Sequence, residues 1–139
     1  MSCTIRPCTV KDCKVIMQLI KEIAIVYNVS PAGIKVNLEA LQEDGFGARP
    51  QFDCYVAELP PGQKSKKGQQ IGKRLIAKAA EVAVSQGCVQ LHMHVASWKA
   101  SEKSFLARRG GEDLTVKEGW TLFHFEDAAL QRLAAESKF

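Results

Sequence analysis

Apolar residues recur every three or four positions near the start of the chain, at Ile16, Leu19, Ile20, Ile23 and Tyr27. This spacing places them on one face of a helix, so it predicts an amphipathic helix over residues 10–27. Thr9 stands where an N-cap is expected, and the carboxylate of Asp12 suits the first turn. Pro31 and Gly33 then end the helical pattern.

Four further helices follow from the same reasoning. They cover residues 38–43, a segment that begins at Ile71, a segment from about Ser101 to Gly110, and residues 127–137. Asp44 and Gly45 are expected to end the first of these. Gly87 suits the position just after the second, where a left-handed backbone is common.

Apolar and alternating segments predict four strands, over residues 3–6, 52–59, 89–95 and 120–125. Within residues 89–95, apolar side chains alternate with Gln90, His92 and His94, which gives that strand two different faces. Helices therefore alternate with strands along most of the chain. This order predicts an α/β domain with a mixed sheet, in which some neighbouring strands are parallel.

The length of 139 residues predicts a single domain over residues 1–139. Hydrophobic residues make up 46% and charged residues 24%, a balance typical of folded proteins. The sequence shows no apolar run long enough to cross a membrane and no N-terminal secretory segment. We therefore expect a cytoplasmic protein without a membrane partner.

The five cysteines include no Cys-x-x-Cys pair. An odd number without that spacing argues against a disulfide framework or a zinc site, so reduced thiols are expected. The net charge of +4 is compatible with a small anionic ligand. It is too weak to indicate nucleic-acid binding, which needs a clustered basic face.

The best candidate for a binding site is the turn that opens the helix at Ile71. It reads Lys67-Gly68-Gln69-Gln70-Ile71-Gly72-Lys73. Backbone N–H groups at a helix start, together with the positive end of the helix dipole, form a site suited to a pyrophosphate. The two lysines would add positive charge. The alternative interpretation is a solvated loop with incidental glycines.

Two other groups of polar residues also have a functional and a structural interpretation. His92 and His94 share a strand face near Cys88, but three convergent ligands with a carboxylate are not evident, so we expect a polar strand face and no metal. Acidic residues gather in two places and could bind a cationic amine or lie on a solvated surface: Glu39, Glu43, Asp44, Glu112, Asp113 and Glu118.

Several short sequence motifs follow one another along the chain in a recognisable order. They include Ile5-Arg6-Pro7, Leu19-Ile20-Lys21-Glu22-Ile23-Ala24, Glu43-Asp44-Gly45-Phe46-Gly47, Cys54-Tyr55-Val56-Ala57-Glu58, Arg108-Arg109-Gly110 and Glu118-Gly119-Trp120. In this register the chain resembles, nearly from end to end, the diamine (spermidine/spermine and thialysine) branch of the GCN5-related N-acetyltransferases.

The resemblance implies the mixed-sheet fold of that family, a homodimer, acetyl-CoA as cofactor and a polyamine or thialysine-like amine as substrate. It also implies where these molecules bind. The cofactor would lie against Gly68, Gln69, Gln70, Ile71, Gly72, Lys73, His92, Met93, His94 and Lys99. The amine would lie against Val26, Tyr27 and Glu118.

Three departures from the family pattern bear on activity. The family has two more strands between residues 60 and 68, so the central sheet is expected to be incomplete; either the product is internally shortened or the sequence omits a segment. Leu106 stands where the family has a tyrosine that protonates the departing thiolate, and leucine cannot donate a proton. In the phosphate turn Gln70 replaces a glycine and Lys67 an arginine, while Lys99 replaces a cofactor-contacting asparagine.

Two functions are therefore open at the level of sequence. One is an acetyl-CoA-dependent N-acetyltransferase acting on a primary amine. The other is a catalytically impaired or inactive relative that dimerises with a full-length subunit. A third interpretation treats residues 62–73 as a basic loop without a ligand.

Overall fold

The computed structural model describes residues 3–64 and 70–137. The chain divides into two compact units, Met1–Leu91 and His92–Phe139, and each is considered by itself. The single domain over residues 1–139 remains a prediction. Within the described residues, no helix combines the length and the apolar character that crossing a bilayer requires.

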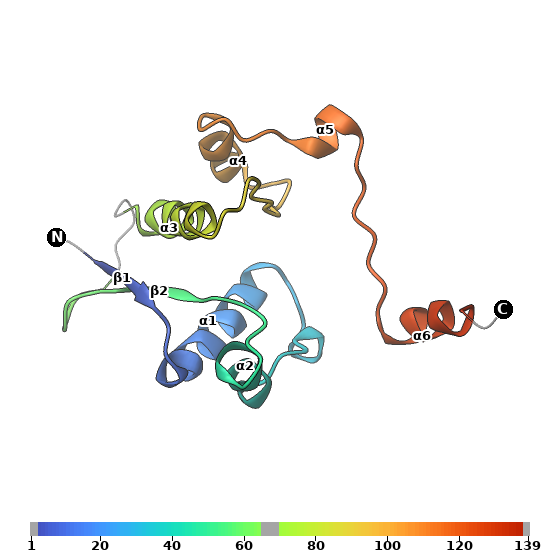
Figure 1. The fold of residues 1–139 in the computed structure, drawn as a ribbon, viewed down its shortest axis with the longest axis horizontal. Helices are drawn as coiled ribbons and strands as arrows, with labels where there is room; N and C mark the ends of the chain where they lie inside the picture. The colour runs from blue at the N-terminus through green and yellow to red at the C-terminus, as the bar shows by residue number, and fades with distance from the viewer. Residues whose placement is uncertain (1–2, 65–69, 138–139) are drawn as a thin grey trace. The chain divides into compact units, whose positions relative to one another are not determined.

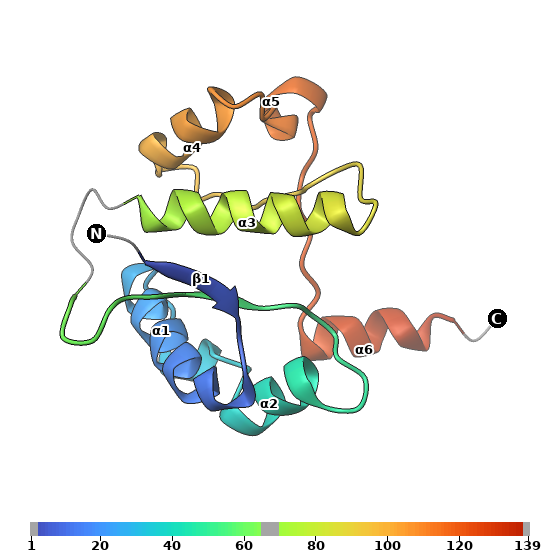
Figure 2. The same ribbon diagram turned by 60° about the vertical axis from the view of Figure 1, so that its left-hand side comes forward.

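The first unit has helices on both faces of a strand pair. Its elements are β1 (Thr4–Pro7), α1 (Cys13–Val26), α2 (Leu38–Phe46), β2 (Tyr55–Glu58) and α3 (Ile71–Ser85). α3 packs against β1 and β2, whereas α1 packs against α2. Figures 1 and 2 show α3 on one side of the strands and the α1–α2 pair on the other.

The positions of the two strands in this unit were predicted correctly, but the direction in which they pair was not. β1 and β2 run antiparallel, with Thr4 opposite Glu58 and Pro7 opposite Tyr55, and they form the whole of the sheet in the described part of the chain. The expectation of parallel neighbours was therefore wrong. A parallel partner would have to come from another strand, and residues 89–95 and 120–125 form no ladder.

The core of the first unit lies between α1 and α2. Its buried members are Cys13, Met17 and Leu41, with Ile16, Ile20, Val36, Leu38 and Phe46 packed around them. The predicted apolar stripe of α1 is thus only half correct, because Leu19 and Ile23 are each 54% exposed. The face of α1 that continues from Cys13 through Met17 to Ala24 is buried instead.

The glycine in α2 has a different role from the one expected. The helix was predicted to end before Asp44-Gly45, but it continues to Phe46. A Cβ atom at Gly45 would lie only 2.8 Å from the ring of Phe52. The glycine therefore allows the chain entering β2 to approach the helix closely, and it is retained inside the helix rather than ending it.

The second unit consists of helices joined by extended segments. They are α4 (Ala100–Ala107), α5 (Leu114–Glu118) and α6 (Asp127–Ala135). α5 was not predicted; Asp113 caps it by accepting hydrogen bonds from the N–H groups of Thr115 and Val116, at 3.1 and 3.3 Å.

The predicted strands 89–95 and 120–125 were wrong, because these residues carry no regular secondary structure. Most of their apolar side chains are exposed, as at Val89 (94%) and Leu122 (78%). Alternation shows which faces a strand would present, but a strand forms only when a neighbour supplies its backbone hydrogen bonds.

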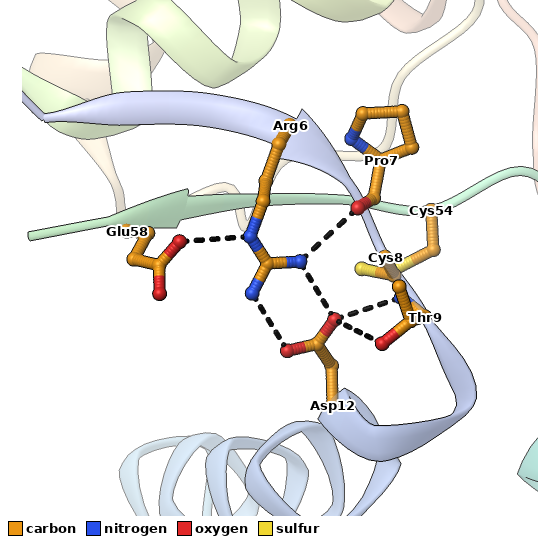
Figure 3. Close-up of polar contacts among 7 residues, drawn as sticks. All are labelled: Arg6, Pro7, Cys8, Thr9, Asp12, Cys54 and Glu58. Atoms are coloured by element: carbon orange, nitrogen blue, oxygen red, sulfur yellow. Dashed lines mark hydrogen bonds and ion pairs between the residues drawn. The ribbon is translucent and has the colours of Figure 1, made fainter.

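One arginine joins the parts of the first unit. The guanidinium of Arg6 donates two hydrogen bonds to the carboxylate of Asp12, at 2.8 and 3.0 Å, and one to Glu58, at 2.8 Å. Asp12 also accepts from the N–H of Thr9, at 2.7 Å. Figure 3 shows this fork linking β1, the turn before α1, and β2. The capping role of Thr9 and Asp12 is confirmed, with Asp12 as the acceptor.

The hydrogen bonds from Arg6, and secondly that from the Thr9 backbone, hold the pKa of Asp12 well below its usual range. A carboxylate whose pKa is lowered on folding stabilises the native state above the unfolded pKa of about 4, and this stabilisation is lost as the pH falls further. We therefore expect the melting temperature to fall below about pH 4. Asp12→Asn should have a lower melting temperature than the wild type at neutral pH. Its melting temperature should also fall less on acidification.

The comparison is made by thermal denaturation from neutral to acidic pH. Glu22→Gln serves as the control, because Glu22 is exposed on α1 and its amide replacement can still accept the hydrogen bond from Gln18. An acid profile for Asp12→Asn that matches the wild-type profile would contradict the role given to Arg6.

Candidate cofactor and amine site

The predicted phosphate turn leads into α3. Gln70 is the residue before the helix, and its backbone is left-handed, with φ 57° and ψ 25°. The first N–H groups of any helix have no acceptor within it, so the N–H groups that begin at Ile71 mark the positive end of α3. Gly68 and Gln69, together with Lys67, lie outside the described residues.

The glycine within this helix start has open space beside it. A Cβ atom built on Gly72 would meet no atom within 4 Å. Packing within the described residues therefore does not require a glycine here. Both Gly72 and Lys73 are exposed. A small residue and a cation beside the first turn fit the approach of a pyrophosphate.

Arg74 fixes the start of α3 to β1. Its guanidinium donates to the carbonyl oxygen of Cys3 at 3.1 Å and to the Cys3 sulfur at 2.8 Å. Cys3 is itself buried. Arg74 is thus used in a structural contact, and the exposed Lys73 is the other cation in the first turn of α3.

The predicted amine-binding residues of the first unit stand at the end of α1. Val26 is the last residue of the helix and Tyr27 its C-cap. Val26 is 62% exposed and Tyr27 38% exposed. Asn28 follows with a left-handed φ of 55°, which turns the chain away from the helix axis. An apolar surface and a phenol are thereby presented at this end of α1.

The other residues predicted to bind the cofactor or the amine belong to the second unit. His92, Met93 and His94 are exposed in a segment without regular structure, and Lys99 is the half-buried N-cap of α4. The predicted polar strand face is therefore not formed. Among the described residues, no group of three or more His, Cys, Asp or Glu side chains is arranged to hold a metal ion.

Leu106 lies on α4 next to the buried Phe105 and is itself half-buried. The guanidinium of Arg109 stacks 3.7 Å from the centre of the Phe105 ring. This contact lies at the C-terminal end of α4, where position 106 also stands. Its side chain carries no group that could donate a proton.

Local contacts engage most of the acidic residues in the second cluster. Glu118, the last residue of α5, accepts a hydrogen bond of 2.5 Å from the indole N–H of Trp120. Glu112 pairs with Lys117 at 2.7 Å, and Asp113 caps α5. The structural interpretation therefore holds for Glu112 and Asp113. Glu118 is exposed, and its carboxylate can still accept from an amine.

The site prediction did not include a close sulfur pair in the first unit. Cys8 directly follows β1 and Cys54 directly precedes β2, and the Cys8 thiol donates to the Cys54 sulfur at 3.0 Å. The sequence held a signal for this pair, since Cys8 follows one predicted strand closely and Cys54 lies within the other. The signal became specific only when the antiparallel register was known.

The chain is similar to several proteins of known activity. It is 33% identical to the thialysine N-epsilon-acetyltransferase of Mus musculus over 96% of this chain and 98% of that protein. It is 31% identical to the thialysine N-epsilon-acetyltransferase of Sus scrofa over 97% and 99%. It is 27% identical to the human spermidine/spermine N(1)-acetyltransferase-like protein 1, of which it covers 24%. No family model matches the chain.

The similarity to the mouse protein extends over 167 positions, which is 28 more than the 139 residues of this chain. At least 28 aligned positions of that protein therefore have no counterpart here. That the missing residues fall between 60 and 68 stays a prediction.

A solved structure shows the same fold. An integron cassette protein from the mobile metagenome of V. cholerae superposes with a TM-score of 0.68 over 96% of this chain and 98% of that chain, at 18% identity. This likeness concerns the fold alone. Together with the relatives above, whose similarity spans nearly the whole chain, it leads to one conclusion. The chain belongs to the GCN5-related N-acetyltransferases, in the branch that contains the thialysine and spermidine/spermine enzymes.

Proposed function

We propose that this chain transfers the acetyl group of acetyl-CoA to a primary amine of the thialysine or polyamine type. The observation that carries this proposal is the 33% identity to a thialysine N-epsilon-acetyltransferase over 96% of the chain. Two further observations support it: the helix start has open space at Gly72 in the first unit, and the carboxylate of Glu118 is exposed in the second.

Each group would contribute a distinct interaction. The N–H groups at the start of α3, with Lys73, would bind the pyrophosphate of the cofactor, which supplies an activated acetyl thioester. Glu118 would hold the cationic end of the amine. Val26 and Tyr27 would cover its aliphatic part, and their exposed surfaces are suited to this contact. His92, Met93, His94 and Lys99 are proposed to lie along the cofactor.

The reaction joins the amine nitrogen to the acetyl carbon and breaks the carbon–sulfur bond. The nitrogen loses a proton and the departing sulfur gains one. Leu106 cannot supply that proton, so the solvent or the amine must do so. Loss of a general acid typically costs about 10²–10⁴-fold in rate. We therefore expect turnover that depends mainly on positioning and is slow for this family.

The direct test uses the purified chain with acetyl-CoA and thialysine, spermidine or spermine. Product formation is followed by mass spectrometry of the amine, because the protein's own cysteines would disturb a thiol-release assay. We expect a slow, enzyme-dependent gain of one acetyl group. Absence of product above the uncatalysed rate with every amine would refute the proposal.

Gly72→Ala tests the helix start. The added methyl group enters open space, so the melting temperature should stay the same or rise slightly. The same methyl group would crowd the phosphate, and we expect CoA to bind about tenfold more weakly. Gln70→Gly should instead strengthen CoA binding, because it removes a side chain from a left-handed position beside the phosphate.

Both variants are measured by calorimetric titration with CoA. Ala77→Ser provides the control, since Ala77 is exposed in the middle of α3 and away from its first turn. Equal CoA affinities for the wild type, Gly72→Ala and Gln70→Gly would remove the phosphate site from the proposal.

Leu106→Tyr tests the missing proton donor. Position 106 is half-buried, so a larger ring can extend towards solvent. If a phenol restores general-acid catalysis, kcat should rise by about 10²–10⁴-fold. Leu106→Phe is the matched control, because it adds the ring without the hydroxyl and should leave kcat unchanged. Equal rates for the two variants would show that the hydroxyl does not act in catalysis.

A second candidate function is supported by the exposed segments 89–95 and 120–125. Their alternating apolar residues lack strand partners in the described structure. We propose as the alternative that the chain is an impaired relative that completes its sheet by dimerising with a full-length subunit. A homodimer, a single domain over residues 1–139 and a cytoplasmic location belong to the first proposal. Co-expression with a full-length relative distinguishes the two functions. The alternative requires mixed dimers and no turnover by the isolated chain.

A further inference from the structure

Two cysteines face each other at the open end of the β1–β2 pair. The register that places Pro7 opposite Tyr55 continues to Cys8 and Cys54. The N–H of Cys8 donates to the carbonyl oxygen of Cys54 at 2.8 Å, so the backbones remain paired at this point. The two sulfur atoms are 3.0 Å apart (Figure 3).

This arrangement satisfies the geometric requirement for a disulfide. Directly opposed residues of antiparallel strands have Cα atoms about 4.5–5.5 Å apart, which lies within the range that a disulfide bridges. The sulfur atoms already touch, so bond formation needs only a small rotation of the side chains. The backbone contact between Cys8 and Cys54 can persist.

The surroundings give the two sulfurs different roles. Burial and, secondly, the hydrogen bond to Cys54 raise the pKa of Cys8 to about 12. Cys8 therefore keeps its proton near neutral pH. Both residues are only half-buried, so a small oxidant can reach them, whereas Cys13 is fully buried. Burial also raises the pKa of Cys13. Cys8 is placed to react with Cys54 because the two sulfur atoms are already 3.0 Å apart.

We propose that Cys8 and Cys54 form a reversible disulfide when the protein meets a peroxide. The Cys54 sulfur attacks the peroxide oxygen, the O–O bond breaks, and a sulfenic acid and one water result. The Cys8 sulfur then attacks the Cys54 sulfur, loses its proton and displaces a second water. Two thiols are oxidised by two electrons, and hydrogen peroxide is reduced to two waters. A dithiol reductant reverses the step.

The bond would close a loop whose ends are 46 positions apart. That loop contains α1, α2 and the turn that follows α1. Closing it restricts the unfolded chain, so the disulfide form should be the more stable one. The strands also lie beside the Arg6–Asp12–Glu58 network, which the cross-link would hold in register. This inference does not depend on acetyl transfer.

The test exposes the wild-type protein to hydrogen peroxide, alkylates the remaining thiols and maps peptides without reduction. We expect a peptide containing Cys8 to be linked to one containing Cys54, and the thiol count to fall from five to three. The melting temperature should rise by roughly 5–10 °C and return to its starting value with a dithiol reductant.

Two variants assign the roles. Cys8→Ser should stop the reaction at a sulfenic acid on Cys54, which dimedone traps, and should abolish the rise in melting temperature. Cys88→Ser should behave as the wild type, because Cys88 is exposed and takes no part in the Cys8–Cys54 contact. A Cys13–Cys54 linkage would overturn the proposal. So would cross-linking between chains through Cys88, or an unlinked Cys8 at peroxide levels that oxidise Cys88.

Discussion

The first unit depends on the fork of hydrogen bonds that Arg6 makes to Asp12 and Glu58. Two short strands are at best marginally stable by themselves. The guanidinium joins them across the pair and attaches both to the turn that begins α1. The Asp12 side chain is only 18% exposed, so it needs a partner for its charge. Arginine meets this need because its planar group can engage two carboxylates at once.

The candidate site is built outward from this unit. α3 packs on the strand pair, and the bonds from Arg74 to Cys3 hold the beginning of the helix near β1. The helix start is thereby fixed where an anion could bind. In the second unit position 106 is a half-buried leucine, which has no proton to donate, and the carboxylate of Glu118 is exposed. Under the proposed function, the helix start and Glu118 would supply the charges that bind the substrates, and no proton donor would stand at position 106.

The exposed segments on either side of α4 and α5 bear on the proposal that this chain pairs with a full-length subunit. Apolar side chains such as Val89 and Leu122 are largely in contact with water. Residues of this kind favour pairing with another strand, and unpaired strand edges promote association between chains. The alignment with the mouse relative is 28 positions longer than this chain, and we propose that the missing positions include the strand neighbours of these segments.

The sequence by itself determined the family, the main helices and the positions of the first two strands. The helix ends could be predicted because they depend on residues close in the chain: Thr9 and Asp12 before α1, and Gly87 with its φ of 79° after α3. The short helix α5 escaped prediction because its five residues are too few for a periodic pattern, although its cap at Asp113 is local.

Only the tertiary structure decided the remainder, because it depends on residues far apart in the chain. The antiparallel register brought Cys8 to Cys54, and the ring of Phe52 explained why Gly45 stays inside a helix. The segments 89–95 and 120–125 have the alternation of strands but no neighbour to bond with, so they remain irregular. A helix carries its hydrogen-bond partners within its own sequence, whereas a strand must find them elsewhere.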